Sequence, residues 1–258
     1  MGGESTTRTA PRSGGKSTTP VGTRAGQRLS GIAVALGIVL FLGGFGWAAL
    51  VYRPYTVPTT SMTPTIDAGD RVLAQRVDGG EVHRGDVVVF TDKTWVTNAP
   101  VVKRVVAVGG DTVACCTGGK LTVNGKQIDE GYLKGGAVED KTIPTVKVPK
   151  GRLFLLGDER QGSLDSSAHL TDAAQGTVAE SAVTARVDAV VWPMKGMLPR
   201  PTGFETLGAL STPGPLRVIV TLIVVGAVLV LGGGAYGPIA KRLGGRRSRT
   251  RTEPVGAR

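Results

Sequence analysis

Two long apolar runs dominate the pattern of hydrophobic and polar positions along the chain. Residues 29–52 and 218–240 contain no Asp, Glu, Lys or Arg. A helix rises about 1.5 Å per residue, and about 20 apolar residues are needed to cross the hydrocarbon core of a bilayer. Core helices of soluble proteins seldom run this far without a charge, so the pattern predicts two transmembrane helices.

The pattern between these two runs changes to short β-branched and apolar segments, most of them bounded by Gly, Asp or Pro. Such segments are typical of strands. Residues 121–128 predict a hairpin, because Asn124 and Gly125 suit the positive-φ positions of a type I′ turn. No convincing amphipathic helix appears between the runs. The predicted fold class is therefore mainly β, with an antiparallel β-sheet domain between two transmembrane α-helices. The predicted strands lie at residues 87–90, 101–102, 105–108, 153–156 and 183–192.

The positive charge of the chain, +11 in total, gathers at its two ends. Residues 1–28 carry five Lys/Arg and one acid, and residues 241–258 carry seven and one, which leaves +1 for the stretch from 29 to 240. Basic flanks of this kind mark the cytoplasmic side of membrane spans. The charge therefore predicts topology rather than a nucleic-acid partner: both termini are expected in the cytoplasm, and the domain between the spans outside the plasma membrane.

Composition divides the rest of the chain. The polar residues 1–28 and 241–258 predict disordered tails. Residues 53–200 are expected to form the extracytoplasmic domain, and residues 201–217 a linker to the second span. The first apolar run is too long for the core of a signal peptide and ends in aromatic residues, so it predicts a retained anchor.

Cysteine and histidine give no sign of a metal site. Cys115 and Cys116 are adjacent, and neighbouring cysteines form a disulfide only in a strained ring, so free thiols or pairing with a partner are favoured. His83 and His169 have no recognisable ligand spacing to these cysteines. No metal and no other cofactor is expected.

Three segments between the spans differ from ordinary strand or turn sequence. Residues 57–65 combine two prolines with five hydroxyl side chains, and Ser61 lies nine positions after Tyr52, near the membrane surface. A Thr/Pro linker leaving the membrane is the alternative. Residues 157–167 are a polar segment after an apolar strand, for which a solvated surface loop is the alternative.

The third segment, residues 101–111, holds Lys103 and Arg104 among valines. Because side chains alternate along a strand, one of the two cations must face the apolar side. Desolvation lowers the pKa of a lysine, and a neutral lysine can accept the proton of a serine hydroxyl, whereas arginine cannot. The alternative is a charge on an edge strand that prevents aggregation.

Taken together, these segments resemble the type I signal peptidases. Residues 61–65 reproduce the S-M-x-P-T pattern of that family, residues 84–90 its R-G-D-hydrophobic-V-x-F pattern, and residues 103–111 its K-R-V and G-D pattern. The resemblance covers about residues 30–193, with the four blocks in order. Glu159 replaces the usual Asn, and Ser167 stands where many members have Arg, so the ion pair of that Arg is missing. The last block is matched by Gly157, Asp158, Arg160, Ser163, Asp165 and Ser166.

The resemblance implies a membrane-bound endopeptidase with Ser61 as nucleophile and Lys103 as general base. It implies that the Ser61 N–H and the Thr59 hydroxyl bind the oxyanion and that Ser163 orients the lysine. The residues expected to shape the site are Gly157, Asp158, Arg160 and Asp165. The candidate walls of the substrate site are Thr60, Met62, Val101 and Val102.

The implied partners are preproteins that carry signal peptides with A-x-A-like sites, together with the lipid bilayer. One alternative is a dedicated Ser-Lys protease that processes a single secretion-system substrate. Another is a non-enzymatic, membrane-anchored scaffold in which Ser61 is inert.

Overall fold

The structure is a computed structural model that describes residues 22–96, 99–116, 119–133 and 142–247. It divides into two compact units, one formed by residues 1–43 with 222–258 and the other by residues 44–221. The helices α1 (Gly22–Val51) and α2 (Leu216–Arg247) are each long and apolar enough to cross a membrane, over Gly26–Val51 and Leu216–Tyr236. Both apolar runs of the sequence are therefore helical.

Small residues line the contact between the two helices in the first unit. A Cβ at Gly37 would lie 2.8 Å from the carbonyl oxygen of Gly226, and Ser30 Oγ donates to the carbonyl of Gly233 at 2.7 Å. Close backbone approach at small residues is the usual way in which membrane helices pack. Both helices also extend into the segments expected to be disordered tails, since α1 begins at Gly22 and α2 ends at Arg247.

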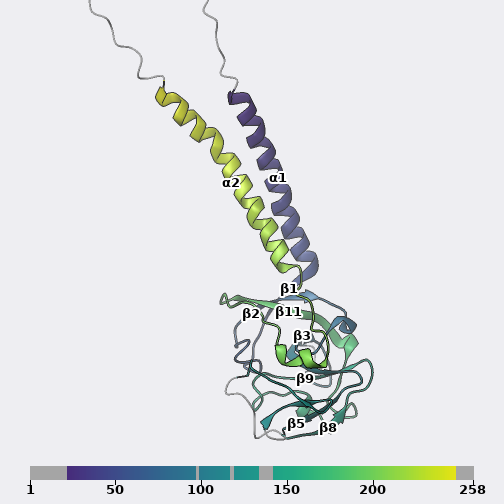
Figure 1. Ribbon diagram of the computed structural model, residues 1–258. Coiled ribbons are helices and arrows are strands. Elements are labelled where there is room, and N and C mark those ends of the chain that lie inside the picture. The colour runs from purple at the N-terminus through teal and green to yellow at the C-terminus, as the bar shows by residue number, and fades with distance from the viewer. Residues whose placement is uncertain (1–21, 97–98, 117–118, 134–141, 248–258) are drawn as a thin grey trace, which may run out of the picture. The chain divides into compact units, whose positions relative to one another are not determined.

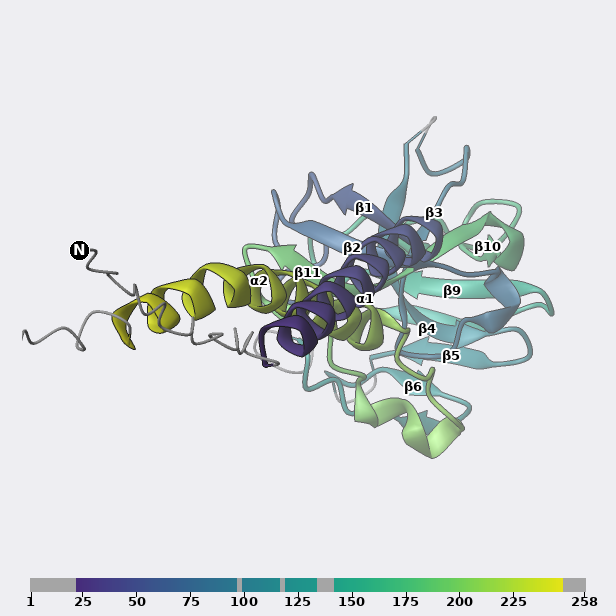
Figure 2. The same cartoon turned by 90° about the horizontal axis from the view of Figure 1, so that it is seen from above.

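The second unit is built on a large antiparallel sheet, which confirms the predicted fold class (Figures 1 and 2). Its strands follow the order β1-β2-β11-β3-β4-β9-β10, and β12 pairs with β11. All the described pairs in it are antiparallel, from β1 against β2 to β10 against β9. The strands are β1 (Tyr52–Thr56), β2 (Arg71–Arg76), β3 (Val87–Phe90), β4 (Val101–Val108), β9 (Arg152–Leu156), β10 (Val178–Ala179), β11 (Val183–Trp192) and β12 (Gly196–Met197).

A smaller antiparallel sheet has the order β7-β6-β5-β8. The predicted hairpin is confirmed: β6 pairs with β7, and Asn124 and Gly125 at its turn have φ of 54° and 75°. Among the residues described between α1 and α2, the only helices are short 3₁₀ turns. The strands of this sheet are β5 (Thr112–Cys115), β6 (Thr122–Val123), β7 (Lys126–Gln127) and β8 (Ile143–Lys147).

Strand β4 is covered on both faces. Val105 packs in one apolar cluster with Phe90 and Leu155, whereas its neighbour Val106 packs in another with Phe154. Successive side chains of a strand point to opposite faces, so both faces of β4 are core. Any polar side chain on β4 therefore needs a partner in the interior.

Two buried carboxylates, Asp86 and Asp188, form a charged cluster with two arginines. Arg186 lies 3.5 Å from Asp188 and 4.0 Å from Asp86, and Arg200 lies 3.1 Å from Asp188 and 3.5 Å from Asp86. Ser211 also donates to Asp86. Both carboxylates are only 1 % exposed, and buried charges must be paired.

Residues 201–217 pack against the sheet domain and so differ from the expected linker. Phe204 is fully buried. Gly214 packs closely against Tyr52, because a Cβ added at Gly214 would lie 2.5 Å from Tyr52 Oη. The Tyr52 hydroxyl donates to Asp188 at 2.8 Å and accepts from the backbone N–H of Leu216 at 3.1 Å. Burial, and then Asp188, raise the pKa of Tyr52, so it stays a neutral donor.

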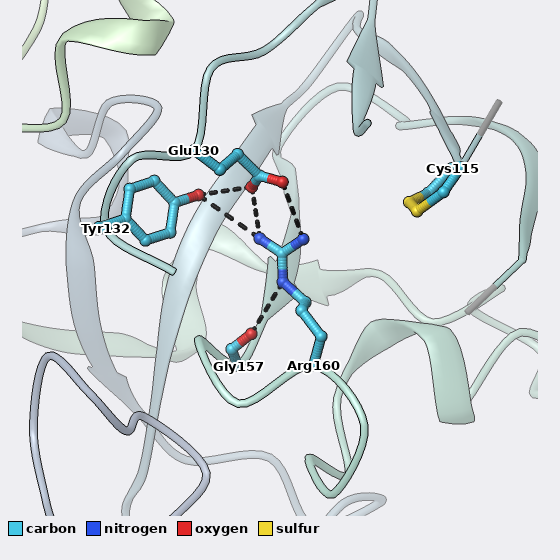
Figure 3. The surroundings of a disulfide bond; sticks show 6 residues. Cys115, Glu130, Tyr132, Gly157 and Arg160 are labelled. Carbon is cyan, nitrogen blue, oxygen red and sulfur yellow. Dashed lines mark hydrogen bonds and ion pairs between the residues drawn. A yellow bond between two sulfur atoms is a disulfide. The ribbon is translucent and has the colours of Figure 1, made fainter. Parts of the chain in front are cut away.

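The expectation of free thiols or of pairing with a partner is wrong for this structure. Cys115 and Cys116 are joined to each other by a disulfide across a cis peptide bond (Figure 3). Cys115 is buried in the apolar cluster of the small sheet, and Cys116 packs against that cluster.

Candidate active site

Ser61 lies in a closed loop that follows β1. The backbone N–H of Val57 donates to the carbonyl of Asp70 at 2.9 Å, and the N–H of Gly69 donates to the carbonyl of Val57 at 2.8 Å. Met62 and Ile66 are fully buried and hold the loop in the core. The Pro-rich segment is therefore a fixed part of the domain, which excludes a free linker, and Ser61 stays partly exposed.

Lys103 on β4 reaches Ser61. Its Nζ donates to Ser61 Oγ at 2.7 Å, and Thr59 Oγ1 lies 3.2 Å from the same oxygen. Lys103 is 4 % exposed. Because β4 lies between β3 and β9, the edge-strand interpretation of this lysine is wrong.

Arg104, the other cation of the pair, is held by the polar loop that begins at Gly157. Its Nε and Nη2 donate to the two carboxylate oxygens of Asp158 at 2.8 and 2.6 Å. Burial lowers the pKa of Arg104, but Asp158 outweighs it and the net change is upward. This bidentate pair fixes the backbone next to Lys103 and shows that the polar loop is not simply a solvated one.

Asp165 has partners even though the usual arginine is absent. Its carboxylate accepts from the backbone N–H of Gly157 at 3.0 Å, from the N–H of Ser167 at 3.1 Å and from Ser167 Oγ at 2.6 Å. Ser167, which stands where many family members have arginine, thus donates a hydroxyl and a backbone amide to Asp165. Asp165 is fully buried, and these bonds close the loop on itself.

The same loop touches the backbone of Ser61 directly. The N–H of Glu159 donates to the carbonyl of Ser61 at 3.1 Å. A Cβ added at Gly157 would lie 2.5 Å from that carbonyl and 2.5 Å from the Cβ of Ser163. Ser163 is therefore packed next to Gly157 and, at 4 % exposed, is buried.

Arg160 contacts two residues that the sequence analysis did not identify, Glu130 and Tyr132. Its guanidinium pairs with Glu130, and Tyr132 lies beside that pair. Both residues lie between β7 and β8, in a segment without a motif. No local signal could have found them, because the contacts join positions about 30 residues apart in the chain.

A cleft of about 300 Å³ opens beside the Ser61–Lys103 pair. Of the candidate wall residues, Thr60, Val101 and Val102 line this cleft, whereas Met62 is in the core and is not among the lining residues. Other apolar walls come from segments that the sequence analysis did not consider. The lining residues are Tyr55, Thr56, Val57, Pro58, Thr59, Thr60, Ser61, Val96, Ala99, Pro100, Val101, Val102, Lys103, Gly162 and Leu164.

Within the described part of the chain, no group of three or more His, Cys, Asp or Glu side chains could hold a metal ion. Beside the cleft, the amine of Lys103 and the hydroxyl of Thr59 instead meet the hydroxyl of Ser61.

Comparison with known proteins shows the family of the chain. The family model for "Signal peptidase, peptidase S26" matches residues 28–192. Signal peptidase I of Mycobacterium tuberculosis is 31% identical in an alignment that covers 66% of this chain and 74% of that protein. Signal peptidase I of Bacillus amyloliquefaciens is 32% identical over 64% of this chain and 84% of its own length. Signal peptidase IB of Staphylococcus aureus is 34% identical over 63% of this chain and 86% of its own length. The chain therefore belongs to the peptidase S26 family of signal peptidases, and it is a serine endopeptidase with two apolar helices suited to a membrane.

Proposed function

We propose that this signal peptidase removes N-terminal signal peptides from exported preproteins, with Ser61 as nucleophile and Lys103 as general base. One observation carries the assignment: the amine of a lysine buried in the sheet lies 2.7 Å from a serine hydroxyl at the cleft. A base must lie within hydrogen-bond reach of the proton that it takes. In the described residues, this pair opens onto the cleft where a peptide can lie.

In this mechanism Ser61 Oγ attacks the scissile carbonyl carbon while neutral Lys103 takes the hydroxyl proton. The step uses the neutral form of the amine, which a lysine can adopt and an arginine cannot. The backbone N–H of Ser61 and the Thr59 hydroxyl stabilise the oxyanion. Lys103 returns the proton to the leaving amine, and water then hydrolyses the ester to Ser61. Ser163 orients the amine, and Asp165 keeps the surrounding loop in shape.

The apolar cleft suits an extended peptide with small side chains, such as the end of a signal peptide. Val57, Val101 and Val102 offer walls of moderate size, and the prolines at positions 58 and 100 stiffen two of the edges. We further propose that both termini are cytoplasmic and that residues 53–200 lie outside the plasma membrane, since the basic residues gather beyond the two apolar helices.

The test is cleavage of an A-x-A preprotein by the purified full chain in detergent, comparing wild type with Ser61→Ala and Lys103→Ala. The expected result is cleavage after the A-x-A site by wild type only. Equal cleavage by all three proteins would show that the dyad is wrongly assigned. Cleavage of one preprotein out of a varied panel would favour the dedicated protease, and binding without turnover would favour the scaffold.

A further inference from the structure

We propose that Glu130 and Tyr132, which lie between β7 and β8, are positioning residues for Ser61 and act through Arg160 and the turn at residues 157–160. The inference rests on the proposed function, because it concerns the same nucleophile. Figure 3 shows the contacts: the Arg160 side chain extends from its loop to the Glu130 carboxylate, with the Tyr132 hydroxyl beside the pair.

The ion pair between Arg160 and Glu130 is desolvated. Arg160 Nη1 donates to Glu130 Oε2 at 3.0 Å, and Nη2 donates to Oε1. The two side chains are 3% and 8% exposed. Burial lowers the pKa of Arg160, but Glu130 outweighs it, and the net shift is upward. An arginine at this depth needs its carboxylate, because an uncompensated buried charge is strongly unfavourable.

Tyr132 lies between two arginines. Its hydroxyl donates to Glu130 at 2.6 Å and lies 3.4 Å from Arg160 Nη2, while its ring lies 4.0 Å from the guanidinium carbon of Arg104. Burial raises the pKa of Tyr132 well above its usual value, so the hydroxyl keeps its proton. Tyr132 therefore links the pair to the residue that follows Lys103.

Arg160 transmits this support to the turn. Its Nε donates to the carbonyl of Gly157 at 3.0 Å, which closes residues 157–160. The N–H of Glu159 in that turn donates to the Ser61 carbonyl at 3.1 Å, and Gly157 lies against the same oxygen. A shift of the Arg160 guanidinium therefore moves the turn, and the turn moves Ser61.

Neither Glu130 nor Tyr132 lines the cleft, so neither side chain can contact the substrate there directly. A positioning role therefore predicts a change in kcat without a change in KM. A role in substrate binding predicts the opposite.

The decisive variant is Glu130→Gln, measured on the full chain in detergent with an A-x-A preprotein. Glutamine keeps the shape but loses the charge, and its amide N–H₂ faces the N–H groups of Arg160. We expect kcat to fall about 10- to 100-fold, the range for a catalytic group displaced by up to about 1 Å, with KM unchanged. The matched control is Asp129→Asn, which alters the neighbouring exposed carboxylate and should leave both constants at the wild-type values. Glu130→Asp keeps the charge and should recover part of the lost kcat.

All assays are run below the melting temperature of every variant, which is measured by circular dichroism. A folded Glu130→Gln enzyme with wild-type kcat would overturn the inference. If Glu130→Gln does not fold, Tyr132→Phe decides: it keeps the ring on Arg104 and removes only the hydroxyl. It should lower kcat several-fold at constant KM, and an unchanged kcat would equally overturn the inference. If the proposed function is wrong, the wild type will not cleave the preprotein. Cleavage by the wild type together with unchanged kcat in the variants therefore counts against this inference alone.

Discussion

A single methyl group at Gly157 provides a sharp test of how tightly the polar loop is packed on the nucleophile. In Gly157→Ala the new carbon would lie 2.5 Å from the carbonyl oxygen of Ser61 and 2.5 Å from the Cβ of Ser163. Ser163 Oγ lies closer still and could rotate away, but the Ser61 carbonyl oxygen and the Ser163 Cβ cannot. The substitution therefore cannot be absorbed without moving Ser61, Ser163 or the turn.

The size of the movement follows from ordinary contact distances. A carbon and a carbonyl oxygen approach to about 3.3 Å, so a gap of 2.5 Å requires a retreat of about 0.8 Å. A misplacement of about 1 Å can cost about 100-fold in rate, and overpacking costs typically about 1–3 kcal/mol of stability. We expect Gly157→Ala to fold, to melt at a lower temperature, and to lose about 10- to 100-fold in kcat.

The assay measures kcat and KM for an A-x-A preprotein in detergent, with melting followed by circular dichroism. Gly131→Ala is the matched control, because among the described residues, its two chain neighbours aside, no heavy atom lies within 4 Å of its added Cβ. It should leave kcat unchanged. A folded Gly157→Ala enzyme whose kcat is within twofold of wild type would refute the packing argument.

Three further predictions concern the base, the loop and the domain as a whole. Lys103→Arg should fold but lose at least about 100-fold in kcat, because arginine cannot give up its proton to act as the general base for Ser61. Ser167→Ala removes a 2.6 Å bond to the buried Asp165 carboxylate and should lower the free energy of unfolding in urea by about 1.5–3 kcal/mol. Asp111→Asn should destabilise the enzyme at pH 7, because the pKa of the buried Asp111 carboxyl is lowered. Burial alone would raise this pKa, but the hydrogen bonds from Arg84 and other donors outweigh burial. A lowered pKa in the folded state means that ionised Asp111 stabilises the protein above about pH 3.9. The melting-temperature gap to wild type should therefore narrow as the pH falls below that value.

Each of these predictions has a result that contradicts it. Full activity in Lys103→Arg would mean that another group takes the proton. Ser167→Thr retains the hydroxyl and should keep most of the stability, so equal losses in the threonine and alanine variants would contradict the hydrogen-bond argument. A melting-temperature gap in Asp111→Asn that is constant from pH 7 to pH 3 would show that ionisation of this carboxyl is not the stabilising factor.

Local signals predicted most of the framework. The strands β3, β4 and β9 were visible as β-branched or apolar runs, and Asn124 with Gly125 marked the hairpin, because both patterns depend only on neighbouring residues. Alternation along β4 predicted a cation on the apolar side. It could not predict that both Lys103 and Arg104 would be buried, since that depends on what covers each face.

Long-range pairing is what the sequence could not predict. Glu130 and Arg160 are 30 positions apart, and neither position carries a pattern that points to the other. The same holds for the acidic side chain at position 86, which meets Arg200 across 114 positions. The general cost of a strained ring argues against a disulfide between the adjacent Cys115 and Cys116, but it does not decide an individual case.

The cluster around Asp86 and Asp188 limits how the enzyme can be shortened for crystallography or inhibitor screening. The match to the peptidase S26 model ends at residue 192. Three later residues nevertheless bind this cluster: Arg200 and Ser211 contact its carboxylates, and the N–H of Leu216 donates to Tyr52, which itself donates to Asp188. A chain trimmed at the family boundary would keep two buried carboxylates with a single arginine. A membrane-free form should therefore retain the first turn of α2 and be cut only beyond it.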